Sequence, residues 1–199
     1  MPARVLQVSA PAMNGTLRVT VLIEDFAGNT RRTFCLGAAA YEALGAPAAG
    51  TAVEDETLAA LAEAEGEVRA VSRAESLLAY GDNSANGLCR KLRRRGYSQQ
   101  SAEAAVGRML QKGYIREEEQ AYRLVLRDAN SKLWGPRRIL GDLLQKGYPA
   151  ALSRSAIAQA QENGDVDFAA CRQALLLKKF KGEPPDPAAK RRTLYQYGY

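Results

Sequence analysis

The sequence predicts a mainly α-helical fold, in which tandem three-helix repeats form an extended curved array after a small N-terminal antiparallel β-meander. The pattern Leu-x-x-x-Gly-Tyr occurs at residues 92–97, 143–148 and 194–199, each 51 residues after the one before. A second marker, Gly113, has its counterpart at Gly164, again 51 residues later. A period of this size indicates a repeated supersecondary unit. Near the N-terminus, in contrast, apolar residues alternate as they do in strands.

The N-terminal part is expected to form three strands. Apolar residues alternate between positions 17 and 23, with hairpin signals before them at Asn14-Gly15 and after them at Gly28-Asn29. Strands over Arg4–Ser9 and Thr30–Leu36 would then flank this central strand. Because such a meander cannot bury both faces alone, a short helix or a later element should cover one of them.

Helices are expected over most of the remaining chain. A short helix over Ala38–Leu44 and a turn over Gly45–Thr51 come first. Seven further helices are expected at Thr57–Glu65, Glu67–Tyr80, Ser84–Arg95, Ser98–Lys112, Glu117–Ala129, Gly135–Lys146 and Pro149–Asn163. The third repeat would hold one helix from Asp165 to Lys181, a loop at 182–185, and a last helix from Asp186 to Tyr199.

Residues that favour helix ends support these boundaries. Ser98, Asp165 and Asp186 are expected as N-caps, because their side chains can accept hydrogen bonds from first-turn amides. Pro136 suits a first-turn position, where its missing N–H costs nothing. Gly147 stands where a chain leaves a helix with positive φ. The resulting domain organisation is 1–53 for the β-rich domain, 54–66 for a linking helix, 67–114 and 115–164 for repeats one and two, and 165–199 for a shortened repeat three.

Composition removes several classes of function. The chain has no histidine and three separated cysteines, Cys35, Cys89 and Cys171. This excludes His-based nucleophile activation and zinc sites with a His ligand, and no Gly-rich phosphate loop is present. We therefore expect no enzymatic activity, no metal site and no cofactor. No segment approaches the ~20 apolar residues of a membrane span, and the N-terminus does not resemble a signal peptide, so a cytoplasmic protein is expected.

Positive charge is concentrated in the helical part. Residues 1–66 carry 4 Lys/Arg and 8 Asp/Glu, whereas residues 67–199 carry the other 24 and 14, a balance of −4 against +10. The second helix of each repeat is basic, and its cations are the candidate partner-binding residues. They are Arg90, Lys91, Arg93, Arg94 and Arg95 in repeat one, Arg137, Arg138 and Lys146 in repeat two, and Lys190, Arg191 and Arg192 in repeat three.

These basic helices have more than one interpretation. On equivalent faces of stacked units they would form a stripe that tracks phosphates or lines the groove of a protein filament. Three helices per unit, the second of them short, also fit a helix-turn-helix module that binds DNA directly. An adaptor for another protein is a third hypothesis. The alternative without function is that cations favour helix C-termini and keep the surface soluble.

The second repeat resembles a known family. The frame Trp134-Gly135-Pro136-Arg137-Arg138-Ile139, with Asp142-Leu143 and then Lys146-Gly147-Tyr148, is similar to the signature of the RecX family, the bacterial regulators of RecA. Segments Leu92–Gly96 and Leu110–Ile115 of the first repeat also resemble it. The resemblance covers about Glu67–Asn163 well.

The sequence departs from that family in three places. Gly87-Leu88 stands where the family usually has an acid followed by leucine. Arg116 stands where an acid often follows the Gly-Tyr-[IL] segment, and the third repeat is short.

The resemblance implies a regulator without catalytic activity. Such proteins bind RecA and lodge in the groove of the RecA–single-stranded DNA filament, where they restrain ATP hydrolysis, strand exchange and co-protease activity. It thus implies a part in DNA repair, recombination and the SOS response, with RecA and its filament as partners and weak direct DNA binding as an additional contact. We further expect no membrane association and a monomeric protein.

Overall fold

A computed structural model describes residues 2–25, 28–181 and 186–199 of the chain. The chain divides into two compact units, of which the first comprises Met1–Tyr80 and Cys89–Lys112 and the second Gly81–Leu88 and Gly113–Tyr199. Each unit is described by itself below. The five-part division drawn from the sequence stays a prediction.

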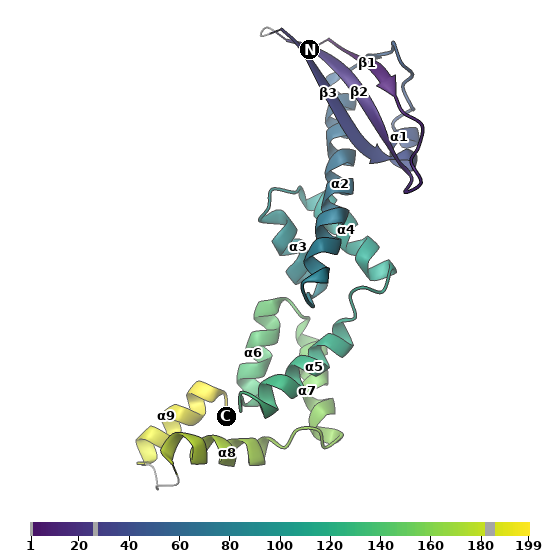
Figure 1. Ribbon diagram of the computed structural model, residues 1–199. Helices are drawn as coiled ribbons and strands as arrows, with labels where there is room; N and C mark the ends of the chain where they lie inside the picture. The colour runs from purple at the N-terminus through teal and green to yellow at the C-terminus, as the bar shows by residue number, and fades with distance from the viewer. Residues whose placement is uncertain (1, 26–27, 182–185) are drawn as a thin grey trace. The chain divides into compact units, whose positions relative to one another are not determined.

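The first unit begins with a four-stranded antiparallel sheet in the order β3-β2-β1-β4 (Figure 1). Its strands are β1 (Ala3–Val8), β2 (Thr16–Asp25), β3 (Gly28–Gly37) and β4 (Ala52–Val53). The predicted central strand is confirmed, because β2 pairs with both β1 and β3. The fourth strand corrects the expected three-stranded meander: Val53, just after the predicted turn, pairs with Ala3 on β1.

One face of the sheet carries the core of the first unit. Alternate residues of the strands point into it, together with residues of helices α1 (Ala38–Ala43) and α2 (Asp55–Ala79). The fully buried members include Val5, Val19, Val21, Phe34, Leu36 and Leu61. The expectation that a short helix or a later element covers the sheet is therefore confirmed, and both do so.

Helix α2 corrects a second prediction, which placed a break at Gly66. The structure instead has one continuous helix of 25 residues through this glycine. The glycine allows close packing: a Cβ at Gly66 would lie 2.9 Å from Ser101 Oγ on α4 (Gln99–Gln111). Ser101 Oγ in turn donates to Glu63 Oε1 at 2.7 Å. Gly66 thus serves the contact between two helices rather than a turn.

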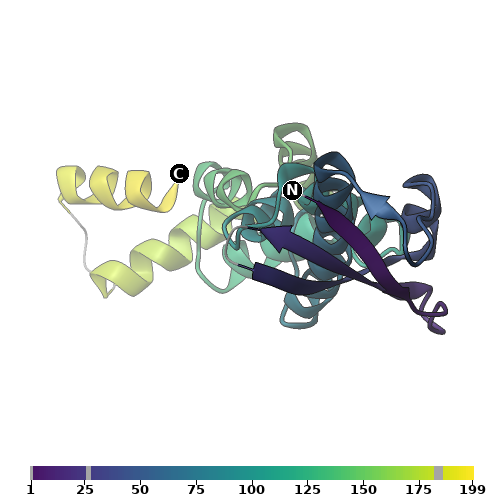
Figure 2. The ribbon, with the colours of Figure 1, turned by 90° about the horizontal axis from the view of Figure 1, so that it is seen from above.

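The second unit is helical. After α3 (Ala85–Arg93), whose first residues belong to it, come α5 (Glu117–Asn130), α6 (Pro136–Lys146), α7 (Ala150–Glu162), α8 (Phe168–Phe180) and α9 (Pro187–Tyr197). Helices α5, α6 and α7 surround a core that includes the fully buried Val125, Ile139 and Leu143. Helix α9 runs back beside α8 in both views (Figures 1 and 2).

The helix boundaries keep the spacing seen in the sequence. Helices α3, α6 and α9 begin at residues 85, 136 and 187, and α4 and α7 begin at residues 99 and 150. Helices α5 and α8 begin at residues 117 and 168. Each step is again 51 residues, so the predicted helices lie within a few residues of their observed places. The tandem repeat array as a whole stays a prediction.

The predicted caps are mostly confirmed. Ser98 Oγ accepts from Ser101 N at 2.9 Å, and Asp186 Oδ2 accepts from two first-turn amides of α9. The cap expected at Asp165 is wrong, because Asp167 Oδ1 caps α8, whereas Asp165 accepts from the hydroxyl of Tyr122 instead. The loop predicted at 182–185 lies outside the described residues.

Candidate partner-binding surface

The three Leu-x-x-x-Gly-Tyr segments end their helices in the same way. The glycines Gly96, Gly147 and Gly198 have φ of 88°, 95° and 88°. In each segment the tyrosine N–H donates to the leucine carbonyl five residues earlier, at 3.4, 3.0 and 2.9 Å in chain order. Each glycine N–H donates to the carbonyl three residues earlier. This pair of bonds is the Schellman motif, which requires a left-handed residue at the glycine.

In the second unit, the glycine end of α6 rests on the first turn of α3. Ser84 Oγ donates to the Lys146 carbonyl at 2.8 Å, and Asn86 Nδ2 donates to the Gly147 carbonyl at 3.2 Å. A Cβ at Gly87 would lie 2.5 Å from the Lys146 oxygen. Only glycine therefore allows this approach without displacing backbone.

The glycine end of α9 rests on the first turn of α6 in a corresponding way. Gly135 N donates to the Tyr197 carbonyl at 2.7 Å, and Arg137 N donates to the Gly198 carbonyl at 3.3 Å. A Cβ at Gly135 would lie 2.5 Å from the Gly198 oxygen. We call these two contacts the helix junctions. In both, carbonyls at a helix C-terminus meet donors at a helix N-terminus, which pairs opposite ends of two helix dipoles.

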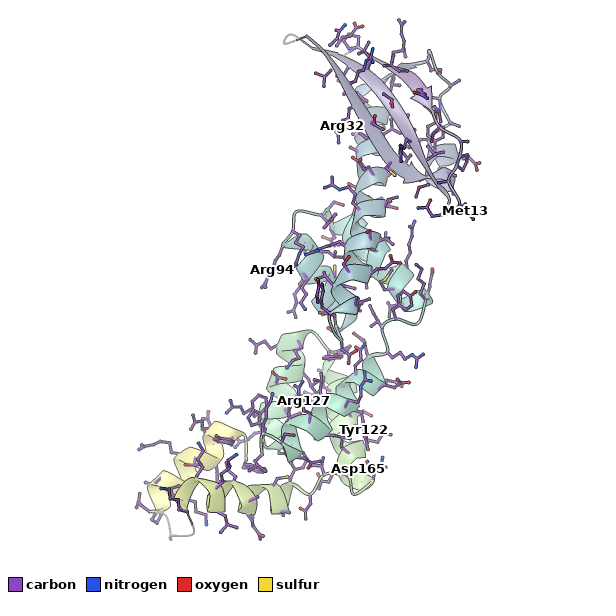
Figure 3. All side chains as sticks on the ribbon, viewed as in Figure 1. Met13, Arg32, Arg94, Tyr122, Arg127 and Asp165 are labelled. Carbon is purple, nitrogen blue, oxygen red and sulfur yellow. The ribbon has the colours of Figure 1, made fainter. Side chains whose placement is uncertain are left out.

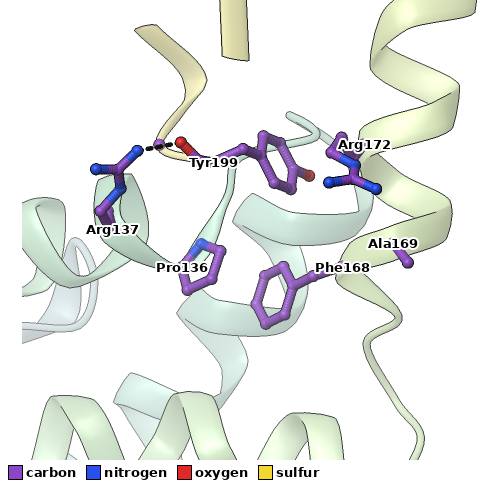
Figure 4. Close-up of a pocket in the computed structure, with 7 residues that line it drawn as sticks. Pro136, Arg137, Phe168, Ala169, Arg172 and Tyr199 are labelled. Atoms are coloured by element: carbon purple, nitrogen blue, oxygen red, sulfur yellow. Dashed lines mark hydrogen bonds between the residues drawn. The ribbon is translucent and has the colours of Figure 1, made fainter. Parts of the chain in front are cut away.

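The side chains of Arg137 and Arg138 support the second junction. Arg138 Nη1 donates to the Gln196 carbonyl at 2.7 Å, and the Arg137 guanidinium donates to the Tyr199 carbonyl oxygen (Figure 4). The Arg138 guanidinium also lies 4.3 Å from the centroid of the Trp134 ring and 5.4 Å from that of Tyr197. The two candidate binding residues therefore hold α9 against α6 within this unit.

An open pocket of about 350 Å³ adjoins the second junction (Figure 4). Pro136, Phe168 and the ring of Tyr199 give it an apolar lining, and the side chains of Arg137 and Arg172 also border it. The Tyr199 hydroxyl donates to the Leu133 carbonyl at 3.4 Å. Burial raises the pKa of Tyr199 to about 12, so its hydroxyl stays protonated at neutral pH.

The basic residues at the end of α3 are placed differently, because their side chains are exposed. Arg93, Arg94 and Arg95 all lie at the surface, and Arg94 projects outward from the helix end (Figure 3). Arg95 Nη1 donates to the Lys91 carbonyl one turn earlier, at 3.2 Å. Arg90 and Lys91 are exposed on the same helix. We call Arg93, Arg94 and Arg95 the arginine cluster.

The remaining candidates lie in the second unit. Lys146 forms an ion pair with Asp142 one turn earlier on α6. Lys190, Arg191 and Arg192 are exposed on α9. The cations coincide at two positions of the repeat: Arg95 corresponds to Lys146 one 51-residue step later, and Arg90 corresponds to Arg192 two steps later. Of the remaining cations in repeat one, Lys91 corresponds to Asp142 and Arg93 to Leu144.

The junction residues on α3 were not identified from the sequence as contacts. Ser84 lies where the predicted helix begins, and its side chain caps α3, since Ser84 Oγ accepts from Gly87 N at 3.0 Å. Its second role, as donor to Lys146, follows from tertiary packing. A signal was nevertheless present at Gly87, because glycine inside the first turn of a helix has no local use. Gly135 gave no such signal, because it is the N-cap of α6, where glycine is common.

Among the residues that the structure describes, no helix combines the length and the apolar character needed to cross a membrane.

Comparisons with known proteins point to one family. No family model matches the chain. Regulatory protein RecX of Pseudomonas entomophila (strain L48) is 32% identical over 118 residues, which are 59% of this chain and 73% of that protein. Regulatory protein RecX of Stenotrophomonas maltophilia (strain R551-3) is 31% identical over 122 residues, 61% of this chain and 72% of that protein.

Solved structures agree with this family at the level of the fold. A crystal structure of regulatory protein RecX matches with a TM-score of 0.67 and 19% identity, covering 99% of this chain and 94% of that one. The crystal structure of RecX from Lactobacillus salivarius matches with a TM-score of 0.55 and 16% identity, over 68% of this chain and 90% of that one. On the identity and coverage of its relatives, this chain belongs to the RecX family of regulatory proteins.

Proposed function

We propose that this protein binds RecA and the RecA–single-stranded DNA filament and inhibits the recombinase, ATPase and co-protease activities. It would thereby regulate DNA repair and the SOS response, acting in the cytoplasm as a monomer and without catalysis of its own. Membership of the RecX family supports a regulatory role. The observation that carries the residue-level proposal is the exposed arginine cluster at the end of α3.

The arginine cluster suits a charged, extended partner. Three guanidinium groups at one helix end concentrate positive charge, which raises the association rate with an acidic surface and favours correct orientation. Their exposure means that little of this charge is consumed by the fold itself. Arg137 and Arg138, in contrast, have intramolecular acceptors, so we assign them first to holding α9 in place.

The test is to replace Arg93, Arg94 and Arg95 together by glutamate and to measure RecA ATPase and strand-exchange activities. The wild-type chain should inhibit both at stoichiometric amounts, and the triple variant should require at least roughly tenfold more protein. The fold should persist, because each lost cation at a helix C-terminus costs only about 0.3–1 kcal/mol. Far-UV circular dichroism checks this.

A matched control replaces Arg4, Arg18 and Arg31 together by glutamate; these are three exposed arginines on the strands of the first unit. Both triple variants lose the same formal charge, from +6 to 0. If inhibition depends on net charge alone, the two variants will be equally weak, and the residue assignment is wrong. If the wild-type chain leaves RecA activity unchanged, the proposed function itself is wrong.

A second candidate function is direct binding of single-stranded DNA. It is favoured by cations that alternate with rings in the second unit: Lys132 lies 4.1 Å from the Trp134 centroid, and Lys179 lies 5.3 Å from that of Tyr197. Tyr195, 76% exposed, could stack on a base. Fluorescence anisotropy with labelled single-stranded DNA, without RecA, decides. Binding that is absent or insensitive to salt excludes this candidate.

A further inference from the structure

The two helix junctions show which group binds the C-terminal ends of α6 and α9, the ends that close with Gly147 and Gly198. At both, the carbonyl of the glycine and that of the residue before it accept hydrogen bonds from the first turn of another helix. At both, a glycine on the receiving helix allows an approach that a Cβ would obstruct at 2.5 Å. The receiving group is thus a helix N-terminus with a glycine at its N-cap, as in Gly135, or in its first turn, as in Gly87.

The end of α3 has the same conformation but no such neighbour among the described residues of the first unit. Its Schellman bonds and the φ of Gly96 match those of the two junction ends. Among the described residues of the first unit, no hydrogen bond reaches the carbonyls of Arg94, Arg95 or Gly96. A Cβ at Gly96 would meet nothing within 4 Å, whereas one at Gly198 would collide with the backbone of Arg138.

We propose that the glycine end of α3 is a docking point for the N-terminal turn of an acidic helix on the partner protein. The first four amides of a helix lack intrahelical acceptors, so they can donate to the carbonyls of Arg95 and Gly96. The second junction makes this contact with the backbone amides of Gly135 and Arg137. At the first junction the side chains of Ser84 and Asn86 donate to the equivalent two carbonyls. The site at Gly96 would offer the same pair of carbonyls to a partner.

The arginine cluster determines that the docking helix is acidic. A bare helix N-terminus carries partial positive charge, and the exposed guanidinium groups of Arg93, Arg94 and Arg95 would repel it. Aspartate and glutamate favour the first turn of a helix for the same dipole reason. Their carboxylates would form charge-assisted hydrogen bonds with these guanidinium groups. The site therefore selects a first turn with both a small residue and carboxylates.

This proposal rests on the proposed function, since its probe is the assembled RecA–single-stranded DNA filament. The variant is Gly96→Asn, because asparagine tolerates the left-handed conformation and its side chain would occupy the docking space. The control is Gly164→Asn at another exposed helix end, where φ is 77° and an added Cβ would meet nothing within 4 Å. Both substitutions impose the same backbone strain.

Anisotropy of the labelled chain titrated with filament gives the affinities. Gly96→Asn should weaken binding roughly tenfold or more, and Gly164→Asn should stay within about twofold of wild type. Equal affinities for both variants would overturn the docking proposal while the wild-type binding leaves the proposed function standing. Absence of wild-type binding would remove both. If Gly96→Asn does not fold, Arg95→Trp and Arg95→Gln take its place. Both remove the charge of Arg95, but only tryptophan adds a bulky ring beside the docking carbonyl. Weaker binding by Arg95→Trp than by Arg95→Gln supports docking, and equal binding contradicts it.

Discussion

At the scale of single residues, Asp128 is the main charged group inside the second unit. Its side chain is 1% exposed, and Oδ1 accepts from Arg127 Nε at 2.8 Å and Lys132 Nζ at 2.9 Å. Its backbone carbonyl accepts from Trp134 N at 3.1 Å. Burial acts to raise the pKa of Asp128, but the hydrogen bonds and charges of Arg127 and Lys132 bring it below its ordinary value. Asp128 thus fixes the connection from α5 to α6.

We expect Asp128→Asn to lower the free energy of unfolding by about 1–3 kcal/mol at pH 7, because a buried carboxylate with charged partners is lost. A depressed folded pKa means that Asp128 stabilises the fold above its unfolded pKa of about 3.9. The difference between wild type and variant should therefore shrink as pH falls below about 4. Urea denaturation at several pH values measures it.

The control for this prediction is Asp142→Asn. Asp142 pairs with Lys146 one turn away on α6, where both side chains are partly exposed, and a pair four residues apart on one helix contributes only about 0.3–0.5 kcal/mol. Equal losses in the two variants, or a difference that persists unchanged at low pH, would contradict the role given to Asp128.

The sequence did not identify Asp128, and the reason is physical. The spacing of Asp128 and Lys132 is visible in the sequence, yet four-residue pairs usually lie in solvent. The burial of this carboxylate depends on the loop at 131–135, where Leu133 has φ of 56° and Trp134 folds back. By contrast, Gly147 and Pro136 were placed correctly, because their conformations depend on the local chain alone.

At the scale of elements, the helix junctions explain the glycines at helix starts. Gly135→Ala should destabilise the second unit by about 1–3 kcal/mol, because the added methyl group overlaps the Gly198 carbonyl and only backbone movement can relieve it. Gly141→Ala is the matched control: it lies within α6 with nothing within 4 Å of its Cβ position. This control should stabilise the protein by about 0.5–1 kcal/mol.

Thermal unfolding measures the expected loss of stability in Gly135→Ala and the expected gain in Gly141→Ala. Hydrogen exchange of the amides of α9 shows whether the loss in Gly135→Ala is located there. Stabilisation by both substitutions would show that α9 does not rest on Gly135. Increased exchange confined to α9 and the start of α6 is the expected pattern, since these are the elements that the junction joins.

Helix α9 also shows how the series of junctions ends among the described residues. Ala188 lies 51 residues after Arg137 and occupies the equivalent position in α9. The amide of Arg137 donates to the Gly198 carbonyl. The amide of Ala188 donates instead to Asp186 Oδ2 at 3.2 Å. A side-chain cap thus takes the place of a second helix. The cap was predictable from Asp186-Pro187, whereas the junctions were not, because they join residues about 60 positions apart.

At the scale of the whole molecule, the elements were largely predictable and their contacts were not. Helix positions follow from caps and periodicity, which act within a few residues. The pairing of β4 with β1 is a contact across about 50 residues, and two residues are too short a strand to leave a pattern. The helix break predicted at Gly66 was wrong for a related reason. Glycine can mark either a helix end or a close contact between helices, and only the tertiary structure distinguishes the two.

The uneven charge of the chain leads to a prediction about the salt dependence of binding. The first 66 residues carry a balance of −4 and the rest +10, so the proposed binding to the RecA–single-stranded DNA filament should weaken as salt screens the cations. We expect the logarithm of the dissociation constant to rise with the logarithm of salt concentration between about 50 and 200 mM. The variant with Arg93, Arg94 and Arg95 reversed should show a shallower slope than wild type.

The Arg4, Arg18 and Arg31 variant separates local from global electrostatics in that titration. If the filament contacts the arginine cluster, this control keeps the steep wild-type slope, because its own cations lie on the strands and make no contact. If both triple variants lose the slope equally, the filament responds to total charge and the cluster has no special place. A shallow slope already in the wild-type chain would mean that apolar contacts, rather than the basic helices, provide most of the binding free energy.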